Sequence, residues 1–116
     1  MEFTSVMNDF KEIITGFAKT FLRQEFSMAY ESVNVLIDHN MVVIRVNDFL
    51  CPAEVMAGVD KKNAAMIEDM YARLFDKAKG PFVAQLNQMM FPQKVVSVQT
   101  GVNFETRVCL LTFILG

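Results

Sequence analysis

The spacing of the apolar residues changes at Ser32, and this change limits the folds that the chain can adopt. Between residues 4 and 24 the apolar positions, among them Phe10, Ile14, Phe17 and Phe21, recur at steps of three and four residues. This is the spacing of one face of an amphipathic helix. From Ser32 onwards apolar and polar residues alternate, as they do along a half-buried strand. A helix followed by strands predicts an α+β fold.

The first alternating segment, SVNVLIDHNMVVIRVN, predicts a β-hairpin. Its two halves flank Asp38, His39 and Asn40, and Asp and Asn are residues that favour turns. His39 is the only histidine of the chain and is expected to be exposed at the tip. A single turn histidine is more often an ordinary surface residue than a catalytic one.

The next segment, FLCPAEVM, has the residues of a helix start with an unusual cap. Pro52 suits the first helical position, and Glu54 suits the third, from which its carboxylate reaches back to the N-cap. Cys51 therefore stands where Ser, Thr, Asp or Asn is normal. Two interpretations remain open: a thiolate stabilised by the helix N-terminus, or a substituted cap without chemistry.

A second helix is predicted from the N-cap Asp60 towards Met90, with a kink or break at Gly80 because Pro81 cannot donate to the preceding turn. In the first helix, Gly16 lowers the helix propensity, so we expect it to mark a close packing contact.

The chain ends in two more predicted strands, QKVVSVQT and TRVCLLTFILG. The last strand is apolar on both faces, so it belongs in the centre of a sheet or under a second layer. Two helical segments cover only one face of a four-stranded sheet, and the other face then needs a cover. A second copy of the chain supplies one, which predicts a homodimer. The residues assigned to this free face are Met41, Val43, Cys109, Leu111, Phe113 and Leu115.

Residues 1–116 are thus expected to form one α+β domain. Its architecture is a two-layer sandwich of a four-stranded antiparallel sheet with helices on one face, in the order α-β-β-α-α-β-β. The net charge of −2 comes with no basic cluster longer than Lys61-Lys62, which argues against nucleic-acid binding. The acidic N-terminus, the short apolar runs and two cysteines 58 positions apart favour a cytoplasmic protein without a membrane span.

The sequence carries no phosphate-binding glycine loop, no metal-binding motif and no paired catalytic carboxylates, so we expect no cofactor, no metal and no enzymatic activity. Nine Met and eleven Phe indicate an adaptable apolar core or, alternatively, a plastic surface for a partner or ligand. In the ligand hypothesis an apolar pocket lies between helices and sheet. Its candidate residues are Cys51, Met66, Met70, Met89 and Met90.

The segment from Asn40 to Leu115 resembles the MpsC-like domain family, whose name refers to a Na+-translocating, membrane-potential-generating system. MVVIRVNDFLCPAE matches the family's first strand and its LTPAE helix start, with Cys51 where the family has Thr. GPFVAQLNQMMFPQKVVSVQTGVNFETRVCLLTFIL matches the second half. The chain departs from the family at EFSMAYES, where relatives carry a Gly-rich GrGP segment. It departs again at FPQKV, which keeps only Lys94 and Val95 of the usual corner.

The resemblance implies an accessory or regulatory role beside a membrane complex linked to cation flux and inorganic-carbon uptake. It implies no catalytic residues. The expectations are therefore a domain that acts through protein–protein contacts, with a membrane transporter as a possible partner, or a small-ligand sensor with a Met/Phe-lined pocket. A third hypothesis is a thiol enzyme or redox sensor that uses Cys51.

Overall fold

The elements follow one another in the predicted order. The computed structural model describes the backbone of residues 2–26 and 32–116 and the side chains of residues 9–24 and 32–116. The predicted departure at EFSMAYES lies mostly on residues 27–31, outside the described residues. The elements are α1 (Glu2–Phe26), β1 (Ser32–Asp38), β2 (Met41–Asn47), α2 (Pro52–Ala57), α3 (Lys61–Met89), β3 (Val95–Asn103) and β4 (Val108–Leu115).

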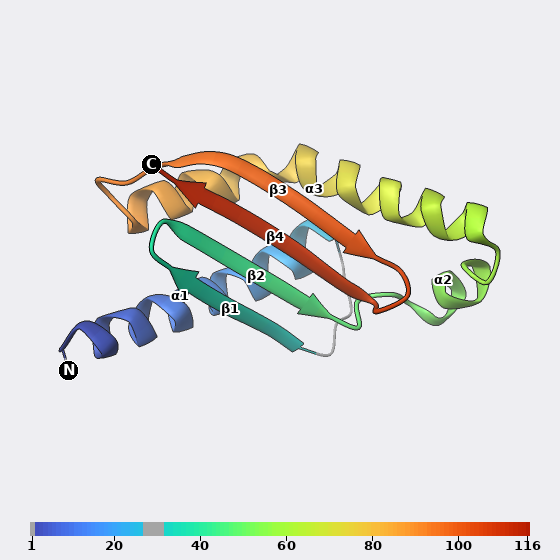
Figure 1. Ribbon diagram of the computed structural model, residues 1–116, viewed down its shortest axis with the longest axis horizontal. Helices are drawn as coiled ribbons and strands as arrows, with labels where there is room; N and C mark the ends of the chain where they lie inside the picture. The colour runs from blue at the N-terminus through green and yellow to red at the C-terminus, as the bar shows by residue number, and fades with distance from the viewer. Residues whose placement is uncertain (1, 27–31) are drawn as a thin grey trace.

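The four strands form one antiparallel sheet in the order β1-β2-β4-β3. Figure 1 shows α1 and α3 on the same side of this sheet, behind the strands, so the opposite face is open. The predicted two-layer α+β sandwich is confirmed. The doubly apolar last strand, β4, takes one of the two central places, as the sequence predicts.

The core lies between the sheet and the two long helices. Helix α1 contributes the buried residues Ile14, Ala18 and Leu22. Helix α3 contributes three more, Phe75, Phe82 and Leu86. The Phe82 ring joins the layers, because it stacks on Phe113 of β4 at 5.2 Å and lies 4.9 Å from Phe17 of α1. Aromatic pairs at these distances stabilise a core beyond their buried area.

The residues predicted for the free sheet face fall on two different faces. The register pairs Val42 with Phe113 and Ile44 with Leu111, so these residues share the buried face. Met41 pairs instead with Ile114 on the open face. Cys109 and Leu115 are also buried against the helices, whereas Val43 lies on the open face with Met41.

The assignment of Cys109, Leu111, Phe113 and Leu115 to the free face was therefore wrong. Alternation identifies which residues of a strand share a face, but only the pairing register decides which face that is. The open face carries the other set of β4 side chains, among them Leu110 and Ile114.

Two expectations about the helices have different outcomes: the kink in α3 is confirmed, and the close contact at Gly16 is wrong. Helix α3 continues through Pro81 without a break, and Figure 1 shows its two halves running in different directions along the sheet. The axis therefore bends, so of the two predicted outcomes the structure shows a kink and no break. Gly16 does not mark a close contact, because a Cβ at that position meets no heavy atom within 4 Å.

Candidate functional site

Cys51 occupies the N-cap of α2, as predicted. Its backbone is extended, with φ −78° and ψ 160°, and its side chain is exposed. The Glu54 Oε1 accepts a hydrogen bond from the Cys51 N–H at 3.0 Å, which is the return bond of a capping box. This geometry matches the helix start that the residues CPAE predict.

The same carboxylate also ties α2 to α3. The hydroxyl of Tyr71 donates to Glu54, with 2.9 Å to each carboxylate oxygen. The Tyr71 ring packs edge-on against Phe49 at 4.9 Å. Burial, together with the bond to Glu54, raises the pKa of Tyr71 well above its usual value. The phenol therefore stays protonated and acts as a hydrogen-bond donor that fixes the corner between the two helices.

This corner does not assemble a nucleophilic pair. His39 lies in the turn between β1 and β2, and Figure 1 shows that turn at the opposite end of the sheet from α2. Nucleophilic catalysis by Cys51 requires a base within hydrogen-bond reach. Cys51 and the only histidine of the chain therefore do not meet within one copy.

The four candidate methionines lie in two separate places. Met66 and Met70 lie on the outer surface of α3, near its start, with 68% and 43% of their area exposed. Met89 and Met90 are half-buried at the other end of the helix and pack against the core. About 20 residues of helix span roughly 30 Å, so the two pairs do not line one pocket. Cys51 stands apart from both pairs, at the start of α2.

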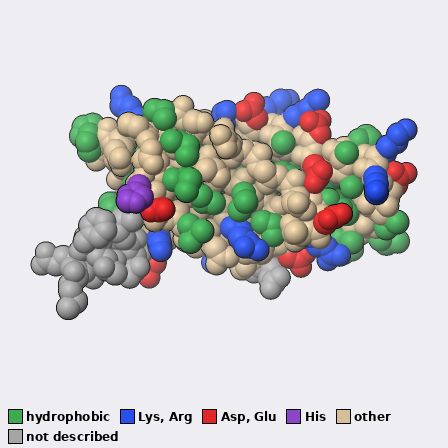
Figure 2. All heavy atoms as spheres, in the orientation of Figure 1, with side chains coloured by type: hydrophobic (Ala, Val, Ile, Leu, Met, Phe, Trp, Pro, Cys, Tyr) green, Lys and Arg blue, Asp and Glu red, His purple; other side chains and the backbone are tan. Residues whose placement is uncertain are grey.

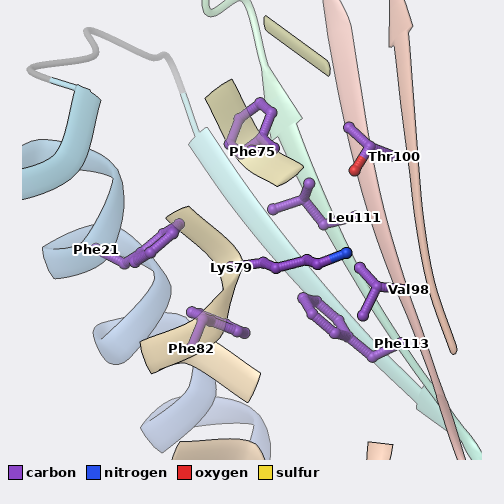
Figure 3. A pocket seen from close by; sticks show the side chains of 8 residues that line it. All are labelled: Phe21, Phe75, Lys79, Phe82, Val98, Thr100, Leu111 and Phe113. Atoms are coloured by element: carbon purple, nitrogen blue, oxygen red, sulfur yellow. The ribbon is translucent and has the colours of Figure 1, made fainter. Parts of the chain in front are cut away.

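The space between the helices and the sheet is nearly filled. Figure 3 shows its lining, in which Lys79 extends from α3 towards β3, between aromatic rings. The cavity has a volume of about 10 Å³, which is room for one water molecule at most. The Lys79 Nζ lies 2.7 Å from Asp76 Oδ1. The lining residues are Phe21, Phe75, Lys79, Phe82, Val98, Thr100, Leu111 and Phe113. No small organic ligand fits this space in the described conformation.

An apolar stripe runs along the exposed side of α3. Met66, Met70 and Leu74 are four residues apart, so they lie above one another on one helix face. Leu74 is 40% exposed. Charged residues flank the stripe, and Asp69 pairs with Arg73 at 2.9 Å. Large apolar side chains in a row on a helix surface are typical of a contact site for another protein.

A second depression lies between the start of α3 and the β3–β4 turn. It is an open groove of about 680 Å³. Phe104 forms part of its wall, and its N–H donates to Glu68 Oε2 at 2.9 Å. A Cβ on Gly58 overlaps the Phe104 ring, so this turn packs directly on the α2–α3 corner. Glu68 carries no signal of this contact in the sequence, because its partner is 36 residues away.

Within residues 2–26 and 32–116, no helix is both long and apolar enough to cross a membrane. The same part of the chain holds no group of three or more His, Cys, Asp or Glu side chains placed to bind a metal ion. The surfaces that remain as candidates are the α3 stripe, the groove beside Phe104 and the open face of the sheet.

Comparison with known proteins adds one finding. Residues 5–116 match the sequence model of a family described as "Na+-translocating membrane potential-generating system (MpsC)". No curated protein and no solved structure matches the chain. The family match extends the resemblance noted above from Asn40–Leu115 to nearly the full length.

Proposed function

Because the chain belongs to the MpsC family, we propose that it is a non-enzymatic accessory domain of a membrane Na+-translocating system, acting through protein–protein contacts. The family description supplies the link to a membrane system. The α3 stripe is the observation that supports a contact role. The proposal assigns the stripe to a subunit of that system and leaves the chemistry of ion transport to the membrane subunits.

The composition of the stripe suits a docking surface. Methionine side chains are unbranched and polarisable, so Met66 and Met70 adjust to the shape of a partner. Two further exposed apolar residues, Met56 and Val59, lie at the α2–α3 corner near the start of the same helix. Figure 2 shows hydrophobic side chains gathered at this end of the molecule.

The charges beside the stripe favour a polar rim around an apolar centre. Asp69 and Arg73 lie on one flank, and Lys77 continues the row of charges by one turn. Protein–protein interfaces commonly combine an apolar centre with such a rim. Because the rim charges carry both signs, the partner surface is expected to be mixed in charge rather than strongly acidic or basic.

The test is direct binding to the membrane subunits of the system from the same organism, held in lipid nanodiscs. The double variant Met66→Ser/Met70→Ser removes the centre of the stripe, and binding is expected to weaken by about tenfold or more. The control is Val96→Thr, which changes an exposed apolar residue on β3 and leaves the affinity unchanged. Wild-type protein that does not bind at about 100 μM contradicts the accessory proposal. Equal binding by the double variant shows that the stripe is not the docking site.

A further inference from the structure

The open face of the sheet carries a row of residues that crosses all four strands. Leu36 of β1 pairs with Val43 of β2, Val43 pairs with Thr112 of β4, and Thr112 pairs with Gln99 of β3. Figure 2 looks onto this face and shows hydrophobic side chains spread over it. Leu36 is 58% exposed, a large value for a leucine in a strand.

On the two central strands, β4 and β2, large side chains flank this row on both sides. On β4 the row is flanked by Leu110 and Ile114, both apolar. On β2 it is flanked by Met41 and Arg45, whose long side chains both have extended apolar stems. A two-fold axis along the row places each row residue over the same residue of a second copy. It places each flanking residue over the residue on the other side of the row, so Leu110 meets the partner's Ile114.

We propose that a second copy of this chain covers the open face, related by a two-fold axis that runs along the row from Leu36 to Gln99. In this homodimer each strand lies over the same strand of the partner in the opposite direction. The two sheets then form an aligned sandwich, in which the strand directions differ by about 30° and the layers lie about 10 Å apart. This dimer uses a different surface from the α3 stripe, so it does not depend on the proposed function.

Charge complementarity favours a second copy as the occupant. Asp38 pairs with Met41 across β1 and β2, whereas Arg45 lies four residues further along β2, about 13 Å away. The axis brings Arg45 of one copy opposite the partner's Met41, and therefore beside the partner's Asp38. The contact occurs twice, once on each side of the axis.

The groups that form this contact are available within one copy. Arg45 is exposed, and its Nε donates to Asn47 Oδ1 at 2.7 Å. Arg45 makes no ion pair within the described residues. Asp38 is 72% exposed at its side chain, and within the described residues its ion-pair partner is His39, with His39 Nε2 at 3.5 Å from Asp38 Oδ1. Arg45 can therefore pair with the partner's Asp38 without giving up an ion pair within the described residues.

The available area sets the expected affinity. Four strands at a spacing of about 4.8 Å and seven residues at about 3.3 Å give a face of roughly 440 Å² on each copy. Two such faces come to roughly 900 Å², below the range of about 1,200–2,000 Å² of stable specific interfaces and within the range of weak, transient ones. The dimer is therefore expected to dissociate in the micromolar range.

Sedimentation velocity over a range of concentrations tests the proposal. The wild-type protein is expected to shift from monomer to dimer between about 1 and 200 μM. Leu36→Lys places a charge on the axis row and is expected to abolish the dimer, while circular dichroism reports whether the monomer still folds. The matched control Ile13→Lys introduces the same charge at an exposed residue of α1, in the helix layer away from the open face, and is expected to leave the dimer intact.

A charge reversal tests the axis itself. Arg45→Asp and Asp38→Arg are each expected to weaken the dimer by about three- to thirtyfold, because each reversal loses two attractive contacts and creates two repulsive ones. The double variant restores the opposite charges and is expected to recover most of the wild-type affinity. A wild-type protein that stays monomeric at about 200 μM overturns the proposal. If the double variant does not recover the dimer affinity, the proposed axis is wrong. If the monomer instead binds phosphatidylcholine/phosphatidylglycerol vesicles and Leu36→Lys abolishes this binding, a membrane is the occupant of the face.

Discussion

The strongest structural prediction concerns Glu54, whose single carboxylate serves two elements. It accepts the Cys51 N–H at 3.0 Å and the Tyr71 hydroxyl at 2.9 Å. Glu54→Ala removes both bonds and leaves the Tyr71 hydroxyl, at a half-buried site, without this acceptor. Net hydrogen bonds contribute about 0.5–1.5 kcal/mol each, and bonds to charged groups somewhat more.

At about 1 kcal/mol for each of the two partners, the free energy of unfolding is expected to fall by about 2 kcal/mol. For a chain of this length that corresponds to a decrease in Tm of about 8 °C. The assay is urea denaturation followed by circular dichroism, with a thermal melt as an independent measure.

A double-mutant cycle separates the two contributions. Tyr71→Phe keeps the ring packed on Phe49 and removes only the hydroxyl. The coupling energy between Glu54→Ala and Tyr71→Phe is expected to be about 1 kcal/mol. A coupling near zero, with each single variant still destabilised, means that the tyrosine bond does not stabilise the corner. An unchanged stability of Glu54→Ala refutes both parts of the reasoning.

Four further predictions follow from single positions. Gly16→Ala is expected to raise the free energy of unfolding by about 0.5–1 kcal/mol in urea melts, because the added methyl group enters open space on an exposed helix; a loss of stability contradicts this. Cys51→Thr is expected to add about 0.5–1 kcal/mol by the same measurement, since a hydroxyl caps better than a thiol; a lower melting temperature indicates that the thiol has another role. Gly58→Ala is expected to cost about 1–3 kcal/mol, because the new Cβ overlaps the Phe104 ring, and to cost much less in a Phe104→Ala background, where the ring is absent. Burial raises the pKa of Cys109 to about 12, so the folded thiol keeps its proton between about pH 9 and 12 while the unfolded thiol loses it. Stability present below about pH 9 is therefore lost as the pH rises, by up to about 1.4 kcal/mol per pH unit, and Cys109→Ala reduces this slope in urea melts at pH 8 to 11.

Local signals in the sequence were sufficient for the elements themselves. The cap residue Asp60 accepts the Lys62 N–H at 2.8 Å, and the turn at His39 joins two strands whose alternation the sequence shows. Both signals act over a few residues, so no tertiary information is needed to recognise them. Pro81 predicts either a kink or a break, and the local signal does not decide between them. Its ring is exposed on a helix whose neighbours Phe82 and Leu86 are fully packed, and this packing keeps α3 continuous through the missing hydrogen bond.

Contacts between distant segments were beyond the sequence analysis. Glu68 has the position of a solvated helix residue, but the β3–β4 turn brings the Phe104 N–H to its carboxylate. Met66 and Met70 were expected to line a pocket between helices and sheet, but they lie with Leu74 on the exposed stripe of α3. Helical periodicity gives the direction of a side chain, but the length of the neighbouring helix and sheet decides whether anything covers it.

The open face illustrates the same limit in a strand. The apolar residues of β4 form two alternating sets, and the sequence alone does not assign either set to the helices. The pairing of Phe113 with Val42 settles this, because the buried face of β2 is fixed by Ile44 and Val46. Once the register is known, the other set becomes the surface that requires a partner. The need for a cover on one sheet face follows from composition, whereas the residues that meet the cover, and hence the Asp38–Arg45 test, follow only from the register.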